Sequence, residues 1–155
     1  MQTQINCMIL VFLLGIPLGI LAQNTIDRTT HFNIKEGIAI QGYDPVAYFM
    51  DQPKKGSIKY AANHQGINYY FSSEKNKETF LANPSQYEPQ YGGWCAYAMG
   101  DSGERVKINP KAYKIVEGKL YLFYKKIFNN TLKSWNKNEA QLMPKADDYW
   151  WKIIN

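Results

Sequence analysis

Cysteine is scarce in this chain of 155 residues, which contains only Cys7 and Cys95. Cys7 lies in an N-terminal segment that we expect to be removed, so one cysteine would remain and no internal disulfide could form. The fold must therefore be held by its core, for which 12 tyrosines, 7 phenylalanines and 4 tryptophans provide the material. A lone thiol in an oxidising compartment is open to oxidation or mispairing, so we expect Cys95 to be buried, ligated or used.

A long hydrophobic run is also missing. The apolar stretch Met8–Leu21 spans about 14 residues, whereas a membrane-spanning helix needs roughly 20. We therefore predict a signal peptide over residues 1–22, cleaved after Ala22, and a periplasmic or secreted protein without a stable membrane span. Residues 23–33 are polar and aperiodic, which predicts a flexible tether, and residues 34–155 are long enough for one domain with its own core.

The chain lacks a long run of charge of one sign, although its formal net charge is +5. Its lysine pairs, such as Lys54-Lys55 and Lys125-Lys126, are short and spread along the sequence, so nucleic acid is not an expected partner. The sequence shows no Ser-His-Asp pattern, no paired catalytic carboxylates and no phosphate-binding loop. We therefore favour a binding protein over an enzyme.

Apolar periodicity and turn residues predict hairpins interrupted by helices, with no regular βαβ alternation. The predicted strands are 38–40, 46–50, 58–62, 67–71, 113–116 and 120–124, and the predicted helices are 75–82, 84–87, 94–99, one around 128–135 and a last one starting at Pro144. Phe128, Leu132 and Trp135 would share the inward face of the fourth helix. The fold class is α+β, a small antiparallel sheet of hairpins packed with several short helices.

The segment from Tyr91 to Gly100 is the strongest candidate for a site, because it is aromatic, almost uncharged and bounded by glycines. Within a helix, Cys95 and Met99 would project from one face, since they are four residues apart. A thiolate beside a thioether is a soft pair that favours Cu(I), and His64 would add a third ligand if the fold brings it near. The alternatives are that Cys95 and Met99 fill the core and that His64, at a hairpin tip, is solvated.

Several longer motifs resemble the exported single-domain branch of the YHS domain family, over residues 38–155. They are Gly42-Tyr43-Asp44-Pro45-Val46-Ala47-Tyr48-Phe49, Tyr70-Phe71-Ser72-Ser73, Phe80-Leu81-Ala82-Asn83-Pro84, Tyr91-Gly92-Gly93-Trp94-Cys95-Ala96-Tyr97, Gly118-Lys119-Leu120-Tyr121-Leu122 and Lys145-Ala146-Asp147-Asp148-Tyr149-Trp150. The resemblance implies a small α+β module found in bacterial envelope proteins and, in other branches, attached to copper-transporting ATPases and metal-dependent hydroxylases. A role in handling heavy-metal ions, copper above all, is what the resemblance implies.

This chain departs from the metal-associated branches at two positions. Ser72 stands where those branches often carry a cysteine, and Tyr70 replaces the histidine of the family's name. Cys95 then remains as the soft ligand, while Tyr43 and Asp44 match the exported branch's own motif and are candidates to line a site. Asp44 also precedes a proline, where an aspartate usually shapes a turn.

Two hypotheses of function follow. The first is an exported protein that binds a soft metal ion such as copper through Cys95 with Met99 or His64. The second is a non-metal binding module, whose aromatic pocket takes a small organic ligand or a protein partner. The residues expected to wall that pocket are Tyr43, Asp44, Tyr91, Trp94 and Tyr97.

Overall fold

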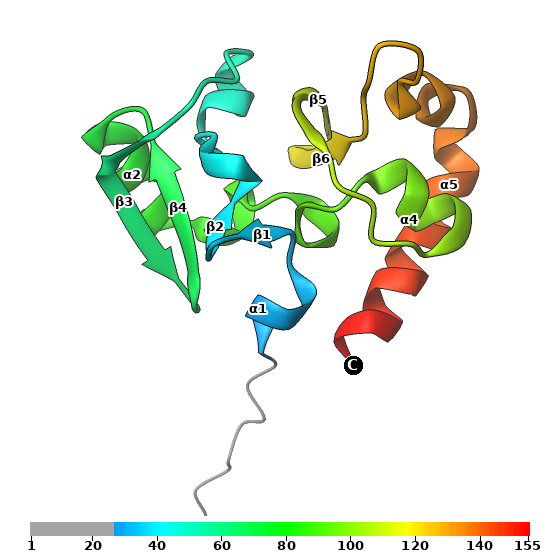
Figure 1. Cartoon of the computed structure of the whole chain (residues 1–155), viewed down its shortest axis with the longest axis horizontal. Coiled ribbons are helices and arrows are strands. Elements are labelled where there is room, and N and C mark those ends of the chain that lie inside the picture. The colour runs from blue at the N-terminus through cyan, green and yellow to red at the C-terminus, as the bar shows by residue number, and fades with distance from the viewer. Residues whose placement is uncertain (1–26) are drawn as a thin grey trace, which may run out of the picture.

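The computed structural model of the chain describes residues 27–155. The predicted signal peptide, 1–22, and the first residues of the predicted tether lie outside the described residues. What is described is an α+β fold, as predicted, with a four-stranded sheet at one end, helices α4 and α5 at the other, and a two-stranded hairpin between them (Figure 1).

The four-stranded sheet contains β1 (Ile34–Lys35), β2 (Ile38–Ala39), β3 (Ser57–His64) and β4 (Ile67–Phe71), in the order β1-β2-β4-β3. The β3–β4 hairpin matches the predicted one, and β1 pairs antiparallel with β2. However, β2 and β4 run parallel, with Ile38 opposite Asn68. The sheet is therefore mixed, and the prediction of a purely antiparallel sheet is wrong, because the long connection after β2 returns the chain in the same direction.

Helix α2 (Glu74–Ala82) follows this sheet and confirms the predicted helix. The Ser73 side chain accepts a hydrogen bond from the backbone N–H of Asn76, which satisfies one of the free donors of the first turn. Phe80 on its inner face is fully buried, with its ring centroid 4.7 Å from that of Tyr69 and 5.2 Å from that of Phe71. A short helix, α3 (Pro84–Tyr87), comes next, also as predicted.

The predicted strand over 46–50 is wrong. The chain there forms the 3-10 helix η2 (Ala47–Met50), after an earlier one, η1 (Ile40–Gly42). The Asp44 carboxylate accepts hydrogen bonds from the backbone N–H groups of Val46 and Ala47. These bonds fold the backbone into a turn directly after Pro45, and that local capping outweighs the strand preference of the apolar residues.

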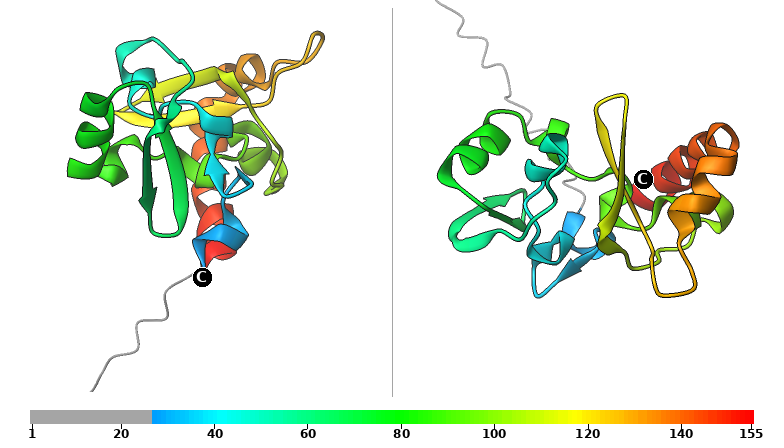
Figure 2. Two further views of the ribbon diagram at one scale, coloured as in Figure 1. Left: turned by 60° about the vertical axis from the view of Figure 1, so that its left-hand side comes forward. Right: turned by 90° about the horizontal axis from the view of Figure 1, so that it is seen from above.

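The hairpin of β5 (Asn109–Val116) and β6 (Lys119–Phe123) lies between two cores (Figure 2). Because strand side chains alternate, Leu120 and Leu122 pack into the core shared with the four-stranded sheet. Tyr121 and Phe123 point the other way, into the core shared with α4 and α5. One strand thus joins the two halves of the molecule.

On the far side of the hairpin, α4 (Ala96–Ser102) packs closely against α5 (Thr131–Ile154). Gly100 permits this approach, since a Cβ there would lie 2.5 Å from the backbone oxygen of Leu142. Trp135 and Ala146 of α5 are fully buried in the same core. Among the described residues no helix is both long and apolar enough to cross a membrane.

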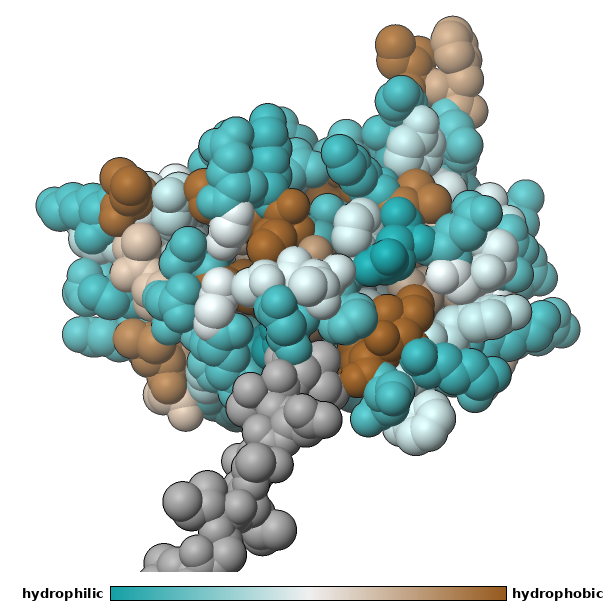
Figure 3. All heavy atoms as spheres, turned by 60° about the horizontal axis from the view of Figure 1, so that its bottom comes forward, coloured by the Kyte–Doolittle hydropathy of each residue, from teal (hydrophilic) through white to brown (hydrophobic). Residues whose placement is uncertain are grey.

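Two predictions about this region are corrected. Pro144 lies inside α5, which begins at Thr131 and kinks at Asn138, and therefore does not start a helix. Burial of Leu142 and Ala146, two residues before and two after Pro144, offsets the single hydrogen bond that a proline removes. Phe128 precedes the helix and does not face the core: it is 99% exposed, at the apolar tip of a loop that projects from the molecule (Figure 3).

The predicted tether, 23–33, is described from residue 27 onward, and this part packs on the domain. Asp27 caps a helical turn, α1 (Arg28–His31), by accepting a hydrogen bond from the backbone N–H of Thr29. Asn33 then donates its backbone N–H to the oxygen of Gly92 at 2.8 Å. Residues 27–33 are therefore an ordered part of the fold.

Candidate functional site

Cys95 is fully buried immediately before α4, in the N-cap position. Its Sγ atom accepts a hydrogen bond from the backbone N–H of Tyr124 at 3.3 Å and lies 3.3 Å from the Thr131 hydroxyl. The sulfur is therefore held between the end of β6 and the first turn of α5. Such a site suits a packed thiol with weak hydrogen bonds better than an accessible ligand.

The structure does not gather the three predicted metal ligands into one accessible site. Met99 is fully buried and belongs to the core on the α4–α5 side, whereas Cys95 belongs to the core on the sheet side. His64 lies on β3, its ring 6.0 Å from that of Phe80, at the opposite end of the molecule from α4 (Figure 1). Within residues 27–155, no group of three or more His, Cys, Asp or Glu side chains is placed to hold a metal ion.

Most of the aromatic residues predicted to line a pocket make contacts within the fold instead. Tyr91 is buried and donates its hydroxyl to Asp147 at 2.9 Å. Burial, and then the Asp147 carboxylate, raise the pKa of Tyr91 well above its ordinary value, so that the phenol remains a donor. Trp94 donates its indole N–H to the backbone oxygen of His31 at 2.6 Å, while Tyr43 and Tyr97 are half-buried at the edge of the core.

Asp44 is the fully buried carboxylate of the Gly42–Pro45 turn. Besides the two bonds within the turn, its Oδ2 atom accepts from the Ser72 backbone N–H at 2.8 Å, the Ser72 hydroxyl at 2.7 Å and the Asn76 side chain at 2.7 Å. The turn interpretation of Asp44 is therefore confirmed. Both carboxylate oxygens already accept hydrogen bonds, within the turn and from Ser72 and Asn76, which leaves little acceptor capacity for a ligand.

A sizeable pocket of the described structure lies elsewhere, between segments far apart in the sequence: α1, the β3–β4 turn and the last turns of α5. Its cavity volume is about 750 Å³. The lining residues are Asp27, Arg28, Thr29, His31, Phe32, Gln65, Gly66, Trp150 and Ile154. A cavity of this size is in the range of pockets that hold small organic molecules, roughly 300–1,000 Å³.

The aromatic side of this pocket rests on the glycine pair of the central stretch. Phe32 and Trp150 meet edge to face, with ring centroids 5.8 Å apart. Gly92 lies directly beneath them, and a Cβ there would be 2.7 Å from Trp150 and 3.1 Å from Phe32. The motif of residues 91–97 therefore supports the pocket from behind, through Gly92 and the Trp94 bond to His31, and does not line it.

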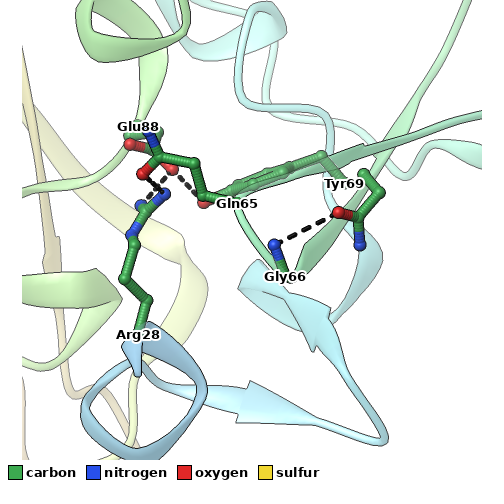
Figure 4. A network of polar contacts seen from close by, with 6 residues as sticks. Arg28, Gln65, Gly66, Tyr69 and Glu88 are labelled. Atoms are coloured by element: carbon green, nitrogen blue, oxygen red, sulfur yellow. Dashed lines mark hydrogen bonds and ion pairs between the residues drawn. The ribbon is translucent and has the colours of Figure 1, made fainter. Parts of the chain in front are cut away.

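The polar side is built around Arg28 (Figure 4). Its guanidinium donates to Gln65 at 2.7 Å and to Glu88 at 2.5 Å, and its carbon lies 4.3 Å from the centre of the Phe32 ring. The Arg28 and Glu88 side chains are only 14% and 16% exposed, so water screens this ion pair less than a surface pair. The ion pair ties α1 to the segment that follows α3, and the bond to Gln65 ties α1 to the β3–β4 turn.

Tyr69, on β4, also belongs to the hydrogen-bond network of Arg28 and Glu88. It is buried, and its hydroxyl donates to the Glu88 atom that also accepts from Arg28, at 2.6 Å. Burial, and then the charge and hydrogen bond of Glu88, raise the pKa of Tyr69 well above its ordinary value, with Arg28 opposing them. Tyr69 thus stays protonated and holds Glu88 in place behind the pocket wall.

His31 is the unusual residue of the pocket. Its Nδ1 atom is buried and, among the residues that the structure describes, is the one buried side-chain nitrogen or oxygen without a hydrogen-bond partner. Buried polar atoms of this kind are rare, because each costs free energy unless something pairs with it. The unpaired atom thus belongs to a residue that lines this pocket.

Comparison with known proteins identifies no relative. No family model matches the chain, and neither a curated protein nor a solved structure matches it. The resemblance to the YHS family stays a prediction, and the site must be argued from its own geometry.

Sequence reasoning missed most of the pocket. Arg28, His31 and Phe32 lie in the segment predicted as a tether, and Trp150 lies in the last predicted helix, which was not assigned to a site. The available signal was weak: an aromatic residue and a histidine next to each other in an otherwise polar segment. Nothing in the spacing along the chain indicates that residues 28–32 meet residues 150–154.

Proposed function

We propose that this chain is an exported binding protein that holds a small, largely apolar organic ligand in the pocket between α1, the β3–β4 turn and α5. The observation that carries the proposal is the pocket itself, about 750 Å³ in volume, with the paired rings of Phe32 and Trp150 on one side and Ile154 beside them. Export is part of the proposal and depends on the signal peptide predicted over residues 1–22.

The polar residues restrict the chemistry of the ligand. Arg28 uses its two terminal nitrogens on Gln65 and Glu88, and a guanidinium has five donor N–H groups, so it keeps donors for a ligand oxygen. The ligand that fits has a flat apolar body and one small polar group, typical of sites in which a few polar contacts fix orientation.

The test uses anilinonaphthalene sulfonate, which combines aromatic rings with one acceptor group and fluoresces when it leaves water. Thr29 lines the pocket and is exposed, so Thr29→Phe should fill the cavity without disturbing the core. Thr30 is the matched control, because it is exposed in the same helical turn and does not line the pocket. We expect saturable binding of one dye per chain, weakened about tenfold or more by Thr29→Phe and unchanged by Thr30→Phe, since one blocking ring removes most of the buried contact.

Equal dye binding by the two folded variants would refute the pocket proposal. Far-ultraviolet circular dichroism and thermal unfolding of both variants establish that the fold is retained. Ligand-observed NMR with small aromatic carboxylates would then extend the same comparison to less apolar molecules.

Copper binding through Cys95, with Met99 or His64, stays a prediction of the sequence and of the resemblance. It requires Sγ to leave its contacts with Tyr124 and Thr131 and to become accessible. Titration of the reduced protein with Cu(I) against a competing chelator tests it, with Cys95→Ser alongside. Stoichiometric binding that vanishes in the variant would support copper, whatever the dye experiment gives.

A further inference from the structure

The loop that joins β6 to α5, residues 125–130, carries the two most exposed large apolar side chains of the described residues. Ile127 is 91% exposed and Phe128 is 99% exposed. They are adjacent and form the tip of a projection that stands clear of the body of the molecule (Figure 2 and Figure 3). Single exposed apolar residues are common, but an adjacent pair on a projecting tip marks an interaction site.

Hydrogen bonds at the tip and at the base define the conformation of this loop. Lys126 and Asn129 exchange backbone hydrogen bonds, N–H to oxygen, at 2.8 and 3.3 Å, which makes Ile127 and Phe128 the corner residues of a tight turn. The base is closed by Thr131, whose backbone N–H and hydroxyl both donate to the oxygen of Tyr124, at 3.1 and 2.9 Å. Corner positions usually hold Gly, Pro, Asn or Asp, so two bulky apolar residues here are not explained by the needs of the turn.

The charge around the tip has one sign. From residue 118 to residue 138 the sequence contains five lysines and no aspartate, glutamate or arginine. All five lysines are exposed, and two of them, Lys125 and Lys126, lie within the loop itself. Within this segment an anionic surface would meet lysines and no carboxylate.

We propose that this loop inserts into the headgroup region of an anionic lipid membrane, with Ile127 and Phe128 as the inserted side chains and the lysines as the electrostatic contact. Two side chains on a convex tip offer too little area for a stable protein interface, which buries at least about 1,200 Å² in total. A bilayer requires less, because shallow burial of a few apolar groups combined with a basic patch gives reversible adsorption.

The orientation is compatible with the proposed pocket. The loop and helix α1 lie at opposite sides of the described structure (Figure 1). Adsorption through the loop would therefore leave the pocket facing away from the lipid. The membrane proposal does not depend on the identity of the ligand.

The experiment is vesicle co-sedimentation of the chain from residue 23, which keeps every described residue. The vesicles contain equal parts phosphatidylcholine and phosphatidylglycerol, with pure phosphatidylcholine for comparison. We expect binding to the anionic vesicles that weakens with salt. Phe128→Ser should lower the partition coefficient about tenfold, and Lys125→Gln with Lys126→Gln should lower it to a similar degree.

Each variant has a matched control at the sheet end of the molecule. Ile58→Ser removes another exposed apolar side chain, from β3, and Lys54→Gln with Lys55→Gln removes another exposed lysine pair. Both controls should bind as the unchanged protein does. The proposal is overturned if the anionic vesicles do not bind the protein, if Phe128→Ser binds as well as Ile58→Ser, or if both lysine pairs matter equally. A dimer that Phe128→Ser disperses in sedimentation velocity, without vesicle binding, would instead assign the loop to a second copy of this chain.

Discussion

Gly92→Ala tests the claim that the central glycine pair exists to support the pocket. Gly92 has φ of +59°, in the left-handed region, and a Cβ there would lie 2.7 Å from the Trp150 ring and 3.1 Å from Phe32. Moving the two rings does not by itself make room, because the backbone Cα of Phe32 also lies 3.2 Å from the added Cβ. A methyl group at this position must therefore push the two rings apart and move the backbone.

The magnitude has two parts. Placing alanine in the left-handed region costs about 1–2 kcal/mol relative to glycine. Forcing a methyl group into a packed contact costs about 1–3 kcal/mol more. We expect the free energy of unfolding to fall by about 2–5 kcal/mol, a large share of the roughly 5–15 kcal/mol available to a typical domain.

Gly118→Ala is the matched control. Gly118 also has a left-handed φ, +72°, but the atom nearest to an added Cβ is the end of the Gln86 side chain, at 3.4 Å. It should show only the backbone part, so the two variants should differ by about 1–3 kcal/mol in urea unfolding. Gly92→Ala should also weaken dye binding, because it displaces two of the residues that line the pocket. Equal losses of stability for the two variants would sink the close-packing argument.

Two further predictions concern other parts of the fold. Asp44→Asn should lower the free energy of unfolding by at least about 2 kcal/mol, because an amide NH₂ would then face the donors of Ser72. The control Asp148→Asn, at an exposed ion pair, should change the free energy of unfolding by less than about 0.5 kcal/mol. Urea unfolding of both variants measures the difference. The hydrogen bond to Asp51 raises the pKa of Tyr113 to about 12, with smaller contributions from slight burial and from the Asp51 charge. The stabilisation that this hydrogen bond gives the fold should therefore persist below a pH of about 10 and be lost as the pH rises towards 12. Asp51→Asn should return the ultraviolet titration of this phenol towards its ordinary range, and an unchanged titration would contradict the assignment.

The parts of the fold that could be predicted from the sequence are those fixed by local chemistry. The β3–β4 hairpin follows from two strand-like runs joined at Gly66, and α2 follows from its Ser73 cap. The errors occurred where a local signal was outweighed. The Asp44 carboxylate turned an apolar, partly aromatic segment into η2, and packing around Leu142 and Ala146 kept α5 continuous through Pro144.

The candidate site could not be predicted, because it is made by tertiary contacts alone. Its residues come from α1, a hairpin turn and the end of α5, and no motif spaces them along the chain. The central stretch did indicate a place of special backbone geometry, at Gly92, but not which side of that backbone faces solvent. The net charge of +5 does not show how the lysines are distributed. The 21-residue segment 118–138, which contains the 125–130 loop, has five lysines and no acidic residue.

The burial of Cys95 gives the protein a built-in reporter of its own opening. Its sulfur is enclosed where the end of β6 meets the first turn of α5, held by Tyr124 and Thr131. A thiol-alkylating reagent can reach it only when these two segments separate, so the alkylation rate at low denaturant measures the population of that opened form. Because the same two residues close the base of the 125–130 loop, alkylation in the presence of vesicles would also show whether lipid contact at the tip loosens the junction beneath it.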